Sequence, residues 1–121
     1  MTTKTFPSMP TVIPEGQHGA AVVEHFDVSE HASAMTAFGG FRSYVPPGRY
    51  ARLKIGGELF MSDTEYERST NYEVVRRAHG RVLIAGLGLG MILVPILRKP
   101  EVRRVVVIEK SADVIALISP H

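Results

Sequence analysis

An apolar run at residues 81–85, followed at once by three glycines, constrains the fold of this chain more than any other feature of its sequence. The run reads Arg-Val-Leu-Ile-Ala and has no polar side chain after the arginine. Such runs are typical of parallel strands, which are buried on both faces of a sheet. A second strand-like segment, residues 102–109, contains the apolar run Val-Val-Val-Ile at residues 105–108 and ends in Glu109. We therefore predict a strand, a glycine turn, a helix over residues 89–98 and a second strand, which together form one β-α-β unit.

The segments around this unit carry their own turn and capping signals. Residues 56–57 are both glycine and fit a two-residue hairpin turn, in which both positions can need a positive φ. Ser62 and Asp63 are good N-cap residues for a helix, and Gly80 suits the position just past its end. Pro95 either kinks its helix or delays its start. These signals predict strands at residues 20–28, 49–55 and 58–61, and helices at residues 64–79 and 112–118.

The chain has 121 residues, the length of one small domain. Residues 1–19 are rich in proline and glycine and predict a flexible N-terminal arm, with an edge segment of a sheet as the alternative. Residues 20–61 form a β-rich segment, and residues 62–121 contain the β-α-β unit. A doubly wound sheet needs more strands than this segment supplies, so we expect an incomplete α/β domain and a truncated chain. Its first strand would then present an apolar edge that invites pairing.

Composition excludes several classes of function. The chain has no cysteine, which rules out thiolate metal sites, and its five histidines lack metal-ligand spacing. A formal charge of +2, with short arginine pairs and no aromatic residues between them, argues against nucleic acid binding. The longest apolar stretch, residues 82–97, is shorter than the ~20 residues of a membrane span. Because the N-terminus also lacks the apolar core of a signal peptide, we expect a cytoplasmic protein without metal, nucleic acid or membrane partners.

The glycine turn is where we expect a ligand to bind. Gly86, Gly88 and Gly90 have no Cβ, so a ligand can approach the backbone, and the N–H groups and dipole of the next helix meet there. Glu109, at the end of the neighbouring strand, can accept hydrogen bonds from both ribose hydroxyls of an adenosine. The turn lacks the lysine of a P-loop, and a dinucleotide site needs a small residue where Met91 stands. The pattern Gly-x-Gly-x-Gly suits S-adenosylmethionine better; a turn that only links a strand to a helix is the alternative.

Residues 50–118 resemble the N-terminal half of spermidine synthase-like proteins within the S-adenosylmethionine-dependent methyltransferase superfamily. The shared order is a β-hairpin, a helix, Val-Leu-Ile-Ala-Gly-Leu-Gly-Leu-Gly at residues 82–90 and Val-Val-Ile-Glu at residues 106–109. The resemblance implies an N-terminal β-hairpin segment followed by the first β-α-β unit of a Rossmann-like methyltransferase fold. It implies that the cofactor is bound by Gly86, Leu87, Gly88, Gly90, Glu109 and Lys110.

The same resemblance places residues 61–63 on the substrate side of the site. Asp63, Tyr66 and Glu73 are the substrate-side candidates. Helix capping is the alternative for Asp63 and packing is the alternative for Tyr66. Glu65 could line the same pocket, and a solvated helix surface is its alternative.

The chain differs from the polyamine synthases of this family at the loop position that selects their cofactor. Leu89 stands at the position of an aspartate that holds the amine of decarboxylated S-adenosylmethionine, and their catalytic acid has no counterpart here. The resemblance therefore favours S-adenosylmethionine over its decarboxylated form and leaves the catalytic residue unknown. We expect a transferase that acts on a small-molecule substrate. The alternative is a non-catalytic ligand-binding module that forms homo-oligomers through an exposed sheet edge.

Overall fold

The structure, a computed structural model, describes residues 6–40 and 44–121, and these residues form two β-sheets and several helices. Four antiparallel strands lie in the order β1-β2-β3-β4, with bounds Gly16–His18, Ala21–Val28, Gly48–Ile55 and Glu58–Ser62. A separate parallel pair consists of β5 (Gly80–Ala85) and β6 (Val102–Ile108). The helices are α2 (Glu30–Thr36), α3 (Glu65–Arg77), α4 (Leu93–Leu97) and α5 (Ala112–Ile118), with short 3-10 turns η1 (Met9–Thr11) and η2 (Ala37–Gly39). The protein is therefore mixed α/β.

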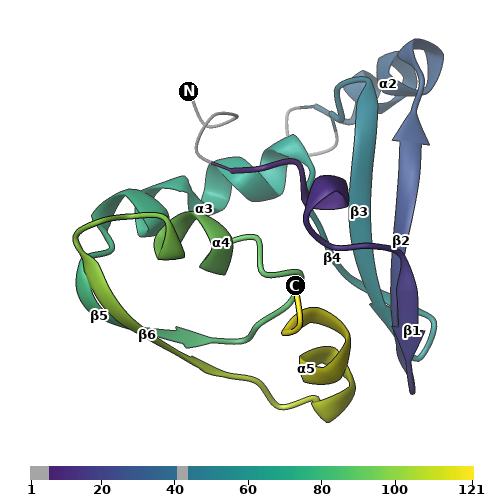
Figure 1. Ribbon diagram of the computed structural model, residues 1–121. Helices are drawn as coiled ribbons and strands as arrows, with labels where there is room; N and C mark the ends of the chain where they lie inside the picture. The colour runs from purple at the N-terminus through teal and green to yellow at the C-terminus, as the bar shows by residue number, and fades with distance from the viewer. Residues whose placement is uncertain (1–5, 41–43) are drawn as a thin grey trace.

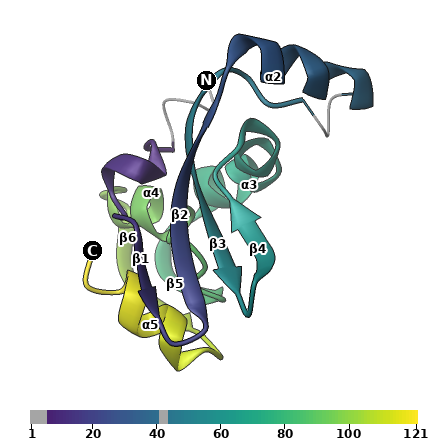
Figure 2. The same ribbon diagram turned by 90° about the vertical axis from the view of Figure 1, so that its right-hand side faces the viewer.

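The two sheets lie on opposite sides of the molecule. Figure 1 shows the four-stranded sheet on the right and the parallel pair on the lower left, with α5 between them and α3 and α4 above the pair. In the view from the side of the four-stranded sheet, α3, α4 and the parallel pair lie behind it (Figure 2). The helix α2 extends past the end of that sheet (Figure 2). The antiparallel sheet thus forms one layer, and the elements that follow it in the chain form the other.

The hairpin of β3 and β4 confirms the predicted glycine turn. Gly56 and Gly57 have φ values of 60° and 82°, a region that residues with a Cβ rarely adopt. Along its other edge β3 pairs with the whole of β2. The three strands predicted here agree with the structure to within one residue at each end.

The strands β5 and β6 confirm the predicted parallel pairing. They are paired from Arg81 opposite Arg104 to Ala85 opposite Ile108. The helix between them is shorter than predicted and begins at Leu93, because residues 89–92 form turns that are not part of an α-helix. Pro95 is the third residue of α4, where a backbone N–H has no partner within the helix. The proline is therefore tolerated without a kink, and the helix begins later than predicted.

One hydrophobic core connects the two layers. Its larger buried members come from the N-terminal segment, β2, β3, α3, the loop after β5, α4 and α5: Phe6, Met9, Ile13, Val23, Leu53, Val75, Leu89, Met91, Ile96, Val114 and Ile118. The core thus includes residues of all three segments that the sequence suggests. The layers are held together by apolar packing, which contributes roughly 25 cal/mol per Å² of apolar surface removed from water.

Of the two predictions for the N-terminal segment, the flexible arm is wrong for residues 6–18 and the edge segment is confirmed by β1, which lies at the edge of its sheet. The side chains of Phe6, Met9 and Ile13 are at most 2% exposed, and β1 pairs with β2. Prolines break regular structure, but they do not prevent three apolar side chains from filling a core. The first part of the predicted arm, residues 1–5, lies outside the described residues.

The predicted N-cap residue is confirmed for α5 and is wrong for α3. The helix α5 has the predicted bounds, and the Oγ of its N-cap residue Ser111 accepts a hydrogen bond from the N–H of Val114 at 3.2 Å. The N-cap residue of α3 is Thr64, so neither Ser62 nor Asp63 caps that helix. Instead, the N–H and hydroxyl of Ser62 both donate to Oε1 of Glu67 at 2.9 Å.

Candidate functional site: the glycine loop and Glu109

The glycine loop connects the end of β5 to the turns that precede α4. Gly86, Gly88 and Gly90 all have φ in the left-handed region, at 97°, 53° and 77°. The N–H of Gly86 continues the parallel ladder by donating to the carbonyl of Ile108 at 2.6 Å, and the N–H of Gly90 donates to the carbonyl of Leu87 at 2.9 Å. The loop is thus a tight, ordered bend in which three residues adopt a conformation that glycine favours.

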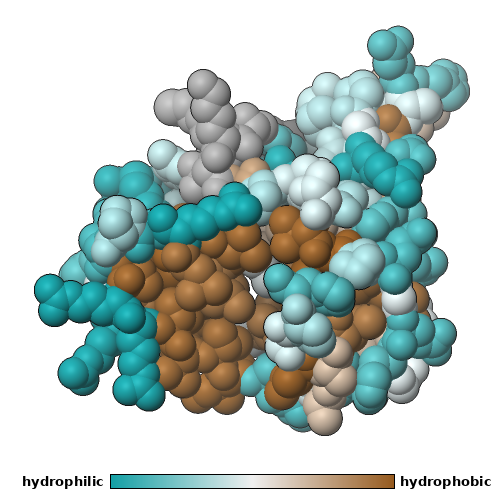
Figure 3. All heavy atoms as spheres, viewed as in Figure 1, coloured by the Kyte–Doolittle hydropathy of each residue, from teal (hydrophilic) through white to brown (hydrophobic). Residues whose placement is uncertain are grey.

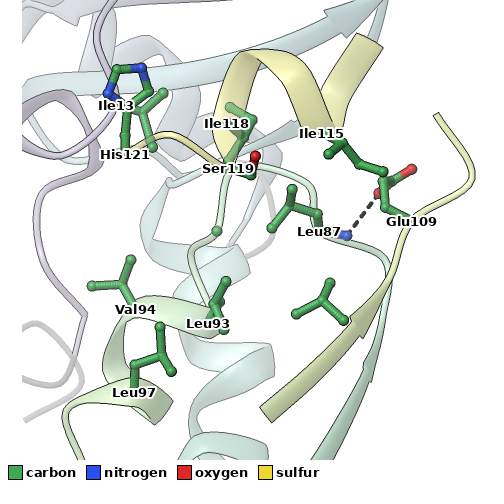
Figure 4. Close-up of a pocket in the computed structure, with 12 residues that line it drawn as sticks. Ile13, Leu87, Leu93, Val94, Leu97, Glu109, Ile115, Ile118, Ser119 and His121 are labelled. Atoms are coloured by element: carbon green, nitrogen blue, oxygen red, sulfur yellow. Dashed lines mark hydrogen bonds between the residues drawn. The ribbon is translucent and has the colours of Figure 1, made fainter. Parts of the chain in front are cut away.

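Glu109 points at this bend. Its Oε1 accepts a hydrogen bond from the N–H of Leu87 at 2.8 Å (Figure 4). Its Oε2 accepts one from the N–H of Ser111 at 2.9 Å. The backbone N–H of Ser111 is the main cause that lowers the pKa of Glu109 below the usual 4.5; partial burial raises the pKa, and the N–H groups of Leu87, Gly88 and Lys110 lower it further. The carboxylate is therefore charged at neutral pH and held against the loop.

A cavity of about 350 Å³ lies beside the loop on the side of Glu109. Its walls are mostly apolar and come from the loop, α4, the end of β6, and α5; they include Leu87, Leu93, Val94, Leu97, Glu109 and Ile115 (Figure 4). Apolar side chains gather over this part of the molecule, around α4 and the parallel pair (Figure 3). An apolar cavity of this size with a charged acceptor at its wall suits a small organic ligand.

A second cavity, of about 240 Å³, lies against the same loop and is lined by Met61 of β4 together with Gly86, Leu87 and Gly88. The Sδ of Met61 accepts a hydrogen bond from the N–H of Leu89 at 3.3 Å. A Cβ on Gly88 would collide with this sulfur. Met61 therefore packs directly on the bend, and of the residues 61–63 that the resemblance places near the ligand, it is the one that reaches the loop.

Asp63 lies elsewhere, in the interior of the protein. It is fully buried, and its carboxylate accepts hydrogen bonds from the N–H groups of Met9 at 2.9 Å and Ala51 at 2.8 Å. It also forms an ion pair with Arg68 at 3.2 Å. These contacts fasten the N-terminal segment, β3 and α3 together, so Asp63 is a structural residue and has no surface for a substrate.

The other predicted site residues do not line the two cavities at the loop. Tyr66 is half-buried on α3, and Lys110 is exposed. Glu73 is exposed and forms ion pairs with Arg76 at 2.8 Å and Arg77 at 3.2 Å on the same helix. The structure thus brings together the loop glycines, Leu87 and Glu109, and leaves the substrate-side candidates outside this group.

The helix dipole adds little to this site. The helix α4 contains five residues and begins three residues after Gly90, and the dipole effect acts within the first turn of a helix. A helical hydrogen bond does reach the loop, from the N–H of Val94 to the carbonyl of Gly90 at 3.0 Å, but the expected dipole of so short a helix is small. The polar groups that the loop offers come from its own backbone and from Glu109.

No family model, curated protein or solved structure matches this chain. Within residues 6–40 and 44–121, no three acidic or histidine side chains cluster as metal ligands would. In the same part of the chain, no helix combines the length and the apolar character that crossing a membrane requires.

Proposed function

We propose that this chain binds S-adenosylmethionine at the glycine loop, as the cofactor site of a transferase that acts on a small molecule. The observation that carries the proposal is the position of Glu109: a charged carboxylate at the end of β6 lies in hydrogen-bond contact with the bend that follows β5. The carboxylate would accept the two ribose hydroxyls, and the loop glycines would contact the methionine part.

The carboxylate has the capacity for this role. An ionised carboxylate offers about four acceptor positions, and the N–H groups of Leu87 and Ser111 use one on each oxygen. The N–H groups of Gly88 and Lys110 also act on this carboxylate, so the ribose hydroxyls would take the lone pairs that the two direct hydrogen bonds leave open. The apolar walls of the neighbouring cavity suit an adenine ring.

Two residues favour S-adenosylmethionine over related ligands. Met91 is 1% exposed and fills the position at which a dinucleotide fold needs a small residue. Leu89 is fully buried and has no group that could pair with the free amine of decarboxylated S-adenosylmethionine. S-adenosylmethionine carries no phosphate, so it has no need of a longer helix at the loop. The parallel pair would then be the first β-α-β unit of a Rossmann-like methyltransferase fold.

Replacing Glu109 with alanine is expected to weaken the binding of S-adenosylhomocysteine by about 5- to 150-fold, because the ribose hydroxyls lose their acceptor. Isothermal titration calorimetry of the wild-type chain and Glu109→Ala measures this change, with NADH as the competing ligand class. Glu101→Ala is the matched control, since Glu101 is an exposed acid just before β6. Equal affinity in wild type and Glu109→Ala, or preferential binding of NADH, would contradict the proposal.

A second candidate function, self-association, is favoured by the outer face of the parallel pair. On this face Leu83, Val106 and Ile108 are 66%, 42% and 61% exposed, whereas parallel strands are normally covered on both faces. Among the described residues, β5 pairs with β6 alone. An antiparallel pairing of two β5 strands about Leu83 would set Arg81 of one copy beside Ala85 of the other. In this register the apolar faces of the two copies form one continuous surface, and the two Arg81 side chains do not lie opposite each other.

Leu83→Glu is expected to abolish such a dimer, because it places two like charges at the centre of the pairing. Sedimentation velocity over a range of protein concentrations measures the change in mass. Leu59→Glu is the control, since Leu59 is 61% exposed on the hairpin of the other sheet. A wild-type chain that stays monomeric at the highest concentration excludes this second function.

A further inference from the structure

The bend of the glycine loop is already occupied on one side by a thioether of the protein itself. The Sδ of Met61 accepts the hydrogen bond of the Leu89 N–H at 3.3 Å and lies in the space where Gly88 lacks a Cβ. Residue 88 therefore has to be glycine for the sulfur of Met61 to pack on the loop. On the other side of the loop lies the cavity next to Glu109, which Leu87 and Gly90 also line.

The position of Met61 is fixed by the residues that follow it. The next residue, Ser62, is bound through its N–H and hydroxyl to Glu67 of α3, and Asp63 is fully buried among its three partners. Met61 itself is half-buried and packs against the core. The backbone of β4 is therefore anchored at this point, and only the flexible side chain of Met61 can leave the loop.

One ligand can reach both sides of the bend. Leu87, whose N–H contacts Glu109, and Leu89, whose N–H contacts Met61, are two residues apart. Two residues of extended chain span at most about 7 Å. The 5′ substituent of a nucleoside held by Glu109 is thus within reach of the thioether of Met61.

We infer that Met61 sets the specificity of this site by the size of the 5′ substituent; the inference rests on the proposed function. An adenosine nucleoside with a short 5′ group, such as 5′-methylthioadenosine, fits beside Glu109 with Met61 in place. A ligand with a complete methionine tail, such as S-adenosylhomocysteine, extends into the second cavity, whose wall is formed by Met61. There it displaces the Met61 side chain from Gly88 and releases the Leu89 N–H. The protein's own thioether therefore competes with the tail of the ligand.

Calorimetric titration of the wild-type chain and three variants with both nucleosides tests this inference. Met61→Ala is expected to tighten S-adenosylhomocysteine binding by about tenfold, since no internal group has to be displaced, and to leave the affinity for 5′-methylthioadenosine unchanged. Met61→Leu keeps the bulk over Gly88 and is expected to behave as the wild type. Leu59→Ala is the control on the same strand, because Leu59 is exposed. Thermal unfolding of each variant verifies that it is folded.

A second measurement observes Met61 directly. In a chain labelled with ¹³C at the methionine methyl groups, S-adenosylhomocysteine is expected to shift the Met61 signal, which Met61→Leu identifies by its loss, and 5′-methylthioadenosine is expected to leave it in place. Equal effects of Met61→Ala on both nucleosides, or an unmoved Met61 signal at saturation, overturn the inference while the proposed function stands. Failure of the wild-type chain and of Met61→Ala to bind either nucleoside overturns the proposed function and the inference with it.

Discussion

Replacing Asp63 with alanine is expected to lower the free energy of unfolding by about 3–5 kcal/mol, because it leaves a buried guanidinium without its counter-charge. The Arg68 side chain is 11% exposed, and its partner carboxylate is fully enclosed. The same substitution strands the N–H groups of Met9 and Ala51, which would stay buried without an acceptor. Urea denaturation followed by far-ultraviolet circular dichroism measures the loss.

The matched control is Asp27→Ala, which also removes an aspartate that pairs with an arginine. Asp27 and Arg49 are 71% and 53% exposed, and exposed pairs contribute about 0–1 kcal/mol. Small domains have a total stability of about 5–15 kcal/mol, so Asp63→Ala can unfold the chain completely. Asp63→Asn, which keeps the shape and one acceptor oxygen, is expected to fall between the two. A loss for Asp63→Ala no greater than that for Asp27→Ala would contradict the structural role of this carboxylate.

Met9→Ala is expected to destabilise the protein by about 2–5 kcal/mol, the usual cost of deleting a large buried aliphatic side chain. Met9 is fully buried in η1 and belongs to the core that connects the two layers. A flexible arm would tolerate the same substitution without effect. The midpoint of thermal unfolding, measured by calorimetry, distinguishes the two cases.

The chain offers a matched control for this substitution in Met35 of α2, which is 57% exposed. Met35→Ala removes the same atoms from a solvated position and is expected to change stability by less than about 0.5 kcal/mol. If Met9→Ala and Met35→Ala have the same unfolding midpoint, the N-terminal segment does not contribute to the core. The conclusion that residues 6–18 are not a flexible arm would then be wrong.

Elements whose signals lie within a few residues could be predicted from the sequence. The φ values at Gly56 and Gly57 and the cap of α5 by Ser111 follow from the chemistry of single residues and their immediate neighbours. Both strands of the parallel pair were recognised from their apolar runs. The helix between them was placed too early, because the three-glycine bend continues as turns up to Ile92.

The candidate site was predictable to the extent that it depends on topology. Parallel strands end at the same edge of a sheet, so the residue after β6 must lie near the residues after β5. This rule predicted the proximity of Glu109 to the glycine loop, which the hydrogen bond to Leu87 confirms. No local rule predicts that Met61, 28 residues before Leu89, turns its sulfur onto the same loop.

The sequence by itself determined the local conformations of this protein and the neighbourhood of its two parallel strands, because turn chemistry, capping and apolar periodicity act over short stretches of chain. Only the tertiary structure decided which polar and apolar side chains lose contact with water. Aspartate is a residue type that favours the N-cap of a helix, yet the carboxylate of Asp63 accepts a hydrogen bond from the N–H of Met9, 54 residues away. Burial is a property of the whole packed chain, and a residue read with its neighbours alone cannot report it.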